Sequence, residues 1–367
     1  MTSKLWLLLA LPVLLRLLRV KPKRSREAII PPRDERVVLL GASSGIGRDL
    51  AHAYARRGAR ICIVARRADA LASVKNECIE LGLSEDKILL VQADMTSASD
   101  LVQLRTEISK AWGGLDTLHI LAGVPSTTTL HDLSGVSLSN SASPASTKRI
   151  FSSSSFVPTP IDGLPSLDGL ENVAKEARAC AEINYVGTVL SLACFLPLLA
   201  SSSISPALHH LSSVAADVPA PVRTIYSATK AAALMAVESC RVECEGCGVR
   251  FFSLLPGTID NGFRLKTSTA QTGGRDELVL PIRHNWERLL LEPSTVIDSI
   301  LYHLSLNPTP QPLIPIYPLS KITALSQPPK ALVHLPWQYR MAFWMRDTPF
   351  GWGYLEKNAR RKYGLPP

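Results

Sequence analysis

Short apolar runs alternate with helix-forming stretches between residues 36 and 255, and this alternation limits the folds that the chain can adopt. The runs are rich in Val, Ile and Leu, as strands buried on both faces are. Strands and helices that alternate in this way build a doubly wound parallel sheet, so we predict an α/β fold. The predicted strands are 37–40, 61–64, 88–93, 117–122, 207–211 and 249–255, and the predicted helices include 45–57, 68–81 and 224–246.

A glycine-rich turn joins the first predicted strand to the first predicted helix. Residues 41–47 have the sequence Gly-Ala-Ser-Ser-Gly-Ile-Gly. Glycine allows a tight turn and a close approach to a ligand, and the free N–H groups where a helix begins bind a pyrophosphate. The same spacing also serves plain helix packing, but its place between a strand and a helix favours dinucleotide binding. The expected contacts are Gly41, Ser43, Ser44, Gly45, Ile46 and Gly47.

The end of the second predicted strand decides between the two nicotinamide cofactors. An acidic residue there would bind the ribose hydroxyl of NAD, whereas an arginine can pair with the additional phosphate of NADP. This chain has Arg66 and Arg67 at that point, so we predict NADP(H), with Arg66 as the first choice for the phosphate. The alternative is that both arginines are solvated surface residues. Asp94, directly after the third strand, is placed to contact the adenine.

A tyrosine and a lysine four residues apart, Tyr226 and Lys230, lie in the helix predicted at 224–246. This spacing places both side chains on one helix face. A free phenol has a pKa of about 10, which is too high for proton transfer near neutral pH, and a neighbouring ammonium group lowers it. Tyr226 could then donate a proton to a carbonyl as a hydride arrives. The alternative is that the pair belongs to an ordinary amphipathic helix surface.

Two further polar residues come from neighbouring segments of the chain. Ser213 lies just past the strand at 207–211 and precedes Tyr226 by thirteen residues, so its hydroxyl could hold a substrate carbonyl. Ser212 is the alternative for this role. Asn184 lies among apolar neighbours in the preceding helix, where its amide must be hydrogen-bonded, and it could equally be a structural residue that kinks the helix.

In this order, the residues resemble the motifs of the short-chain dehydrogenase/reductase family over residues 36–259. The resemblance implies a Rossmann-type fold, with Tyr226 as the acid/base and Lys230 lowering its pKa and binding the nicotinamide ribose. It also implies that Ser213 orients the carbonyl and that Asn184 holds a water linked to Lys230. The resemblance further implies cofactor contacts at Ala122, Gly123, Pro256 and Gly257.

The chain departs from the family pattern at two places beside the expected cofactor pocket. Leu40 stands where members usually have Thr before the first glycine, and Ile120 and Leu121 stand where they usually have two Asn. Both changes remove side chains that brace the pocket, so a weaker grip on the cofactor is expected. They also support the main alternative from another class, a membrane-tethered binding or scaffold protein that keeps the fold without turnover.

The N-terminal end combines an apolar run with basic residues. The run covers 5–15 and is followed by Lys21, Lys23, Arg24 and Arg26. This pattern favours an anchor that spans the membrane or lies on its surface, with the main domain in the cytosol. The alternatives are a core helix and a cleaved signal peptide, although no small-residue cleavage site follows the run.

The sequence predicts three parts along the chain. Residues 1–34 are assigned to the anchor and a basic linker, and 35–320 to the catalytic domain. Within this domain, the Ser- and Pro-rich residues 124–170 are predicted to be a flexible insertion. Residues 321–367 are assigned to an aromatic and basic extension, which could contact lipid headgroups, cover the substrate mouth or build a dimer contact.

The totals exclude some functional classes. The net charge of +9 could indicate nucleic-acid binding, but basic residues beside apolar segments suit an anionic lipid surface better, so no nucleic-acid partner is expected. The seven Cys have no framework spacing and are expected to be reduced thiols. Cys240, Cys244 and Cys247 have no fourth ligand at the usual spacing, so no metal site is predicted.

Together these patterns predict an NADPH-dependent reductase of a ketone or aldehyde on a hydrophobic substrate, which would be a lipid, a steroid or a long-chain compound. The layout resembles that of membrane-bound family members, which implies the endoplasmic reticulum membrane with the catalytic domain facing the cytosol. An NADP-dependent alcohol dehydrogenase, a role like that of a 3-ketosphinganine reductase, and a homodimer remain open alternatives.

Overall fold

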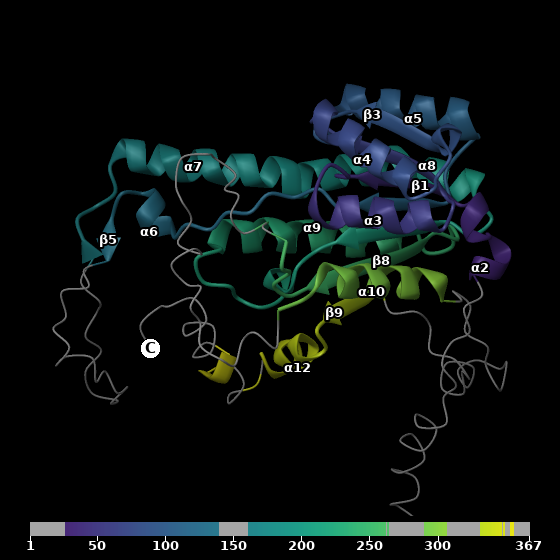
Figure 1. Ribbon diagram of the computed structural model, residues 1–367. Coiled ribbons are helices and arrows are strands. Elements are labelled where there is room, and N and C mark those ends of the chain that lie inside the picture. Colours follow the sequence, from purple (N-terminus) through teal and green to yellow (C-terminus); the bar gives the residue numbers. More distant parts are fainter. Residues whose placement is uncertain are drawn as a thin grey trace, which may run out of the picture.

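The computed structural model describes residues 26–138, 161–261, 263, 290–306, 331–346, 348 and 353–355. Within them, a seven-stranded parallel sheet in the order β3-β2-β1-β4-β7-β8-β9 has helices on both faces (Figure 1). This confirms the predicted doubly wound α/β fold. Its strands are β1 (Arg36–Leu40), β2 (Arg60–Ala65), β3 (Ile88–Gln92), β4 (Thr117–Ile120), β7 (Ala207–Leu211), β8 (Arg250–Pro256) and β9 (Leu332–Leu335).

The helices are of unequal length. The longer ones are α3 (Gly45–Arg56), α4 (Ala68–Glu80), α5 (Ala98–Trp112), α7 (Leu167–Ala181), α8 (Gly187–Ser202), α9 (Thr224–Glu243), α10 (Pro293–Ser305) and α12 (Gln338–Met345). The shorter segments are α2 (Arg26–Ile29), η1 (Pro32–Asp34), η2 (Glu85–Lys87), α6 (Leu130–Leu133), the π-helical η4 (Glu182–Val186) and η5 (Val214–Ala216).

Side chains alternate between the two faces of the sheet, as successive residues of a strand must. On β1, for example, Val37 and Leu39 pack with α3, α4 and α10 on one face. Val38 and Leu40 pack with α5, α8 and α9 on the other. Because both faces are covered, the strands are continuously apolar, and this is why the sequence pattern identified them.

The strand order reverses between β1 and β4, since β2 and β3 extend to one side and β7, β8 and β9 to the other. In open α/β sheets of this kind, ligands bind beyond the carboxyl ends of the strands at such a reversal. The turns after β1 and β4 therefore lie at the place where a cofactor site is expected. These are the turns that begin with Gly41 and with Leu121.

One continuous helical stretch within the described part of the chain, Leu167–Ser202, has the length and hydropathy to cross a membrane. It consists of α7, η4 and α8. Residues of α8 such as Phe195 and Leu199 are completely buried in the core against α5. Packing within the domain thus accounts for its apolar character. The run at 5–15, predicted as an anchor, lies outside the described residues.

The predicted domain boundaries need two adjustments. The segment before β1 belongs to the domain, because the buried Arg26 donates hydrogen bonds to Glu35 (2.6 Å) and to Thr117 (2.8 Å) at the amino-terminal edge of the sheet. At the other end, β9 pairs in parallel with β8, with Leu254 opposite Val333. The segment 321–367 therefore supplies the seventh strand and is not wholly an extension outside the catalytic domain.

The predicted insertion is only partly within the described residues. Its first part contains α6, and β5 (Ser137–Leu138) pairs antiparallel with β6 (Ile161–Asp162). The expectation of a stretch without regular structure is therefore wrong at these flanks. Figure 1 shows α7 extending past the sheet toward α6 and β5. Residues 139–160, the centre of the predicted insertion, lie outside the described residues.

Candidate active site

A cavity of about 960 Å³ opens at the carboxyl ends of the strands. This volume suits a ligand larger than a typical drug, such as a dinucleotide with a substrate beside it. Every residue that the sequence predicted for the cofactor lines it, and so do Ser213, Tyr226 and Lys230. Asn184 is the one predicted site residue that does not line it. The glycine turn and the Tyr226–Lys230 pair therefore line one and the same cavity.

The glycine turn is shaped for close contact. Gly41 has a φ of +104°, and a Cβ at this position would lie 2.6 Å from the backbone nitrogen of Ala122. A Cβ on Gly47 would lie 2.1 Å from the carbonyl oxygen of Gly41. Only glycine fits either position. The backbone at Gly45 and Ile46 can then line the cavity where α3 begins, as pyrophosphate binding requires.

The apolar residues that replace the usual polar braces leave the backbone of this region intact. Leu40 is buried, and its carbonyl oxygen accepts hydrogen bonds from the N–H groups of Leu121 (2.9 Å) and Ala122 (3.0 Å). The N–H groups of Gly41 and Ala42 bond in turn to Val64. The turns after β1 and β4 are thus held together by main-chain bonds that do not depend on these side chains.

Two arginines and an aspartate lie at the end of β2 and β3. Arg66 is mostly exposed, and its guanidinium lies 3.7 Å from a carboxylate oxygen of Asp94. Arg67 donates a hydrogen bond to the hydroxyl of Ser43 in the glycine turn (3.1 Å). The described residues at this corner therefore offer two cations beside the turn, and the carboxylate that would favour NAD is not at the end of β2.

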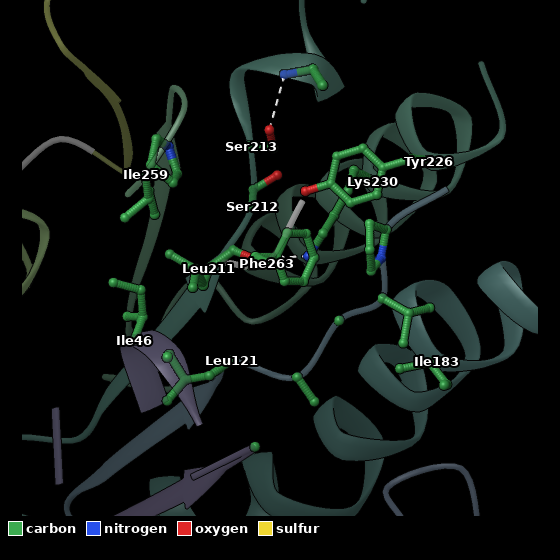
Figure 2. Close-up of a pocket in the computed structure, with 18 of the residues that line it drawn as sticks. Ile46, Leu121, Ile183, Leu211, Ser212, Ser213, Tyr226, Lys230, Ile259 and Phe263 are labelled. Carbon is green, nitrogen blue, oxygen red and sulfur yellow. Dashed lines mark hydrogen bonds between the residues drawn. The ribbon is translucent and has the colours of Figure 1, made fainter. Parts of the chain in front are cut away.

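Tyr226 and Lys230 lie on neighbouring turns of α9 and are both buried (Figure 2). The ammonium group of Lys230 donates a hydrogen bond to the carbonyl oxygen of Leu211 at the end of β7 (3.0 Å). Burial lowers the pKa of Lys230 from 10.5 to about 8, because the charged form loses its hydration. A cation of this kind next to a phenol favours the phenolate, which is the property needed for proton transfer.

Asn184 connects three segments through its amide group. It accepts a hydrogen bond from the Val124 N–H (2.9 Å) and donates to the Val124 carbonyl (3.0 Å) and to the Thr229 hydroxyl (3.0 Å). It lies in the π-helical turn η4, and such turns are frequent at functional sites. Gly123 permits this arrangement, since a Cβ there would lie 3.1 Å from the Asn184 amide oxygen and 3.2 Å from Lys230 Nζ.

The two serines differ in how their hydroxyl groups are used. Ser213 accepts a hydrogen bond from the N–H of Ala215 (3.2 Å), which caps the short helix η5. The buried Ser212 hydroxyl has no hydrogen-bond partner in the described part of the chain. Figure 2 shows it pointing toward Tyr226. Both serines line the cavity, so the alternative of Ser212 for the carbonyl remains open.

Comparison with known proteins decides the family. The short chain dehydrogenase family model matches residues 35–143 and 166–272, which is more than half of the chain. The chain belongs to the short-chain dehydrogenase family. The match is interrupted between 143 and 166, inside the segment predicted as an insertion.

Among known relatives of this short-chain dehydrogenase, a hydroxysteroid 11-beta-dehydrogenase 1-like protein from Xenopus tropicalis is 47% identical over 83 residues, which cover 23% of this chain and 28% of the relative. An 11-beta-hydroxysteroid dehydrogenase-like protein from Arabidopsis thaliana is 27% identical over 223 residues, 61% of this chain and 58% of the relative. The chain thus spans less than two thirds of the length of these curated relatives.

Solved structures agree on the fold. An alcohol dehydrogenase from the archaeon Thermococcus sibiricus, complexed with 5-hydroxy-NADP, has a TM-score of 0.53 at 21% identity and covers 74% of this chain and 91% of its own. A short chain dehydrogenase from Burkholderia cenocepacia, in complex with NADP, has a TM-score of 0.54 at 18% identity, with 88% and 98% covered. At these identities the likeness shows the fold alone.

Several residues of this short-chain dehydrogenase site were not singled out from the sequence. Thr229 holds Asn184, and it could have been suspected because it lies between Tyr226 and Lys230. Arg223 lies beside Tyr226 and lines the cavity, and no motif includes it. Tyr339 of α12 also lines the cavity and packs so closely on Gly257 that a Cβ there would lie 2.8 Å from its ring.

Proposed function

We propose that this short-chain dehydrogenase is an NADPH-dependent reductase of a ketone or aldehyde on a hydrophobic substrate. The observation that carries the proposal is that one cavity joins Tyr226 and Lys230 to a glycine turn with Arg66 and Arg67 beside it. A dinucleotide bound in this cavity would therefore have both the arginines and the tyrosine among the groups around it. The burial of Lys230 without a carboxylate partner among the described residues argues against the scaffold alternative, since such a charge does not stabilise the fold.

The residues of the chain are assigned two tasks: they transfer one proton, and they bind the substrate carbonyl group. NADPH, when bound, supplies the hydride. Tyr226 gives its phenolic proton to the carbonyl oxygen, and the ammonium group of Lys230 stabilises the phenolate that remains. Ser213, or Ser212, donates a hydrogen bond to the same oxygen and fixes its position. In the reverse direction the same groups would take a proton from an alcohol.

The preference for NADP(H) rests on charge. A phosphate on the adenosine ribose carries close to two negative charges, and arginine pairs with it through charge-assisted hydrogen bonds. Arg67 is already aimed across the glycine turn by its bond to Ser43, and Arg66 is accessible to solvent. Two of the solved structures with the same fold hold forms of NADP, which supports this choice.

The preference for a hydrophobic substrate at a membrane surface rests on α12 and on the apolar side chains of the cavity. The inner side of α12 contributes Tyr339 and Ala342 to the cavity. Trp337, directly before this helix, and Met341 and Trp344 within it are 64%, 53% and 68% exposed. Large exposed aromatic side chains with a nearby arginine, Arg340, are typical of the lipid headgroup region. The relatives named as hydroxysteroid dehydrogenases are consistent with such a substrate.

The cofactor assignment can be tested without a known substrate. The fluorescence of NADPH changes on binding and gives its dissociation constant for the full chain. The double variant Arg66→Ala/Arg67→Ala should raise the dissociation constant of NADPH by about tenfold or more and change that of NADH little. An equal loss for both cofactors would overturn the phosphate role. Arg105→Ala, on α5 and outside the lining of the cavity, is the control and should leave both constants unchanged.

The catalytic assignment needs turnover. A series of lipid and short-chain ketones is offered with NADPH, in the presence of phosphatidylcholine vesicles containing phosphatidylserine. Tyr226→Phe should lower kcat by a factor of about a hundred or more and leave the NADPH dissociation constant unchanged. Substantial activity in this variant would show that Tyr226 is not the acid.

A further inference from the structure

Arg223 is a buried cation that lies against the ring of Tyr226. It is the residue directly before α9, and it is only 8% exposed. Its guanidinium carbon lies 5.7 Å from the centroid of the Tyr226 ring, and the side chain lines the cavity. A buried arginine carries a large desolvation cost unless other groups compensate it. The guanidinium therefore lies where it can act on the tyrosine.

The backbone that carries Arg223 is strained. Val222 has a φ of +67°, and it is the one residue other than glycine with a positive φ among the residues that the structure describes. A β-branched side chain is strongly disfavoured in this region, and strain of this kind persists only where the surroundings enforce it. The bonds from Arg223 N–H to the Ala220 carbonyl (3.2 Å) and from Ser227 N–H to the Arg223 carbonyl (2.7 Å) hold the segment on both sides.

We propose that Arg223 is a positioning residue for proton transfer, whose guanidinium orients the ring of Tyr226 and stabilises its phenolate. The inference rests on the proposed role of Tyr226 as the acid. The face of an aromatic ring attracts a cation, and the attraction grows when the ring carries a negative charge. Because both groups are buried, water screens the interaction little.

Arg223 and Lys230 then both act on the same phenol. Lys230 is tied to the carbonyl of Leu211 and lies one helical turn further along α9. Phe263 packs at an angle on the ring, with centroids 6.2 Å apart, and supplies no charge. The other described ionisable groups that line the cavity or pack beside this part of α9 are Arg66, Arg67, Asp94, Glu176, Cys180, Glu182, His210, Tyr339 and Tyr354.

A titration of Tyr226 itself tests the inference without any substrate. The absorbance of tyrosinate near the ultraviolet edge is followed against pH, and the curve of Tyr226→Phe is subtracted from that of the full-length protein. Removing the charge in Arg223→Met should raise the midpoint of this difference curve by at least about one pH unit, because an opposite charge at this range favours the ionised form. Arg223→Lys should restore part of the shift.

The control is an arginine over a different ring. Arg340 lies 5.9 Å from the ring of Trp344, and Arg340→Met should leave the midpoint unchanged. Circular dichroism and NADPH binding show whether each variant is folded, and Arg223→Gln replaces Arg223→Met if the latter is not. A midpoint that stays in place in the neutral variants, or that Arg223→Lys does not bring back, overturns the role of Arg223. Failure of the proposed function would give a different result, because the Tyr226→Phe variant would then turn over substrate as fast as the wild type.

Discussion

The ammonium group of Lys230 is held in the site at a cost to stability, and replacing it should make the protein more stable and inactive. Lys230 is buried, and its one hydrogen bond within the described residues is to the Leu211 carbonyl. No carboxylate pairs with it there. The proposed role of Lys230 is in the chemistry of Tyr226 and not in the fold, and Lys230→Met separates the two.

The size of the effect follows from the pKa. Burial lowers the pKa of Lys230 from 10.5 to about 8, and each pH unit corresponds to about 1.4 kcal/mol. Keeping the charge at pH 7 thus costs about 3 kcal/mol. The variant avoids this cost, but it leaves the Leu211 carbonyl without its hydrogen-bond donor. The lost hydrogen bond lowers the free energy of unfolding by about 1 kcal/mol. We expect its free energy of unfolding at pH 7 to exceed that of the wild type by about 2 kcal/mol.

The sign of the pH dependence is also determined. Between pH 8 and 10.5 the folded protein binds fewer protons at Lys230 than the unfolded chain, so wild-type stability rises with pH through this window. The advantage of Lys230→Met should therefore be present at pH 7, fall as the pH rises above 8, and vanish near pH 10. Urea unfolding followed by circular dichroism at pH 7 and pH 10 measures it, with the exposed Lys110→Met as control. A variant that is less stable than the wild type at pH 7, or a difference that does not change with pH, would refute the reasoning.

Three further predictions concern neighbouring residues. His210 is buried, and neither ring nitrogen has a partner in the described part of the chain, so urea unfolding of His210→Leu should show a gain of about 1–3 kcal/mol at pH 7. The gain should be larger at pH 5, because burial holds the pKa of His210 well below its usual value and the unfolded chain takes up the proton. Gly123→Ala should push against Asn184 and Lys230 and lower kcat tenfold or more in steady-state assays, while circular dichroism shows an unchanged fold. Ser213→Ala should lower kcat by about a hundredfold and Ser212→Ala by less than tenfold, and the reverse order would assign the carbonyl to Ser212.

Most of the sheet could be predicted because its strands are buried on both faces. Strand β7 has the predicted bounds, and β1, β2, β3, β4 and β8 agree with the predicted runs to within two residues. The seventh strand, β9, could not be recognised locally. Its four residues are only partly buried. They pair with residues 253–256 on the outer edge of β8, whose main-chain groups would have no strand partner without β9. Such a strand is determined by its neighbour and not by its own periodicity.

The candidate site divides in a similar way. Tyr226 and Lys230 are four residues apart on one helix, so their proximity follows from local geometry alone. The surroundings of Asn184 do not, because Val124 and Thr229 are 60 and 45 residues away along the chain. The widened π-helical turn that aims its amide at them has no sequence signal of its own. Arg223 lies only three residues before Tyr226, but no motif includes it, and the positive φ of Val222 beside it has no sequence signal.

The apolar substitutions beside the cofactor pocket change which atoms are available to hold a cofactor. With Leu40 and Ile120 in place of polar side chains, the turns after β1 and β4 are joined by main-chain bonds to the Leu40 carbonyl. The N–H groups of the glycine turn and the charges of Arg66 and Arg67 are then the proposed contacts for the phosphates of a dinucleotide. Main-chain groups on a rigid turn need no side-chain ordering when a ligand binds, whereas exposed arginines do. The grip on the cofactor can therefore persist without the usual braces, and its strength depends on how well the two arginines meet the phosphate.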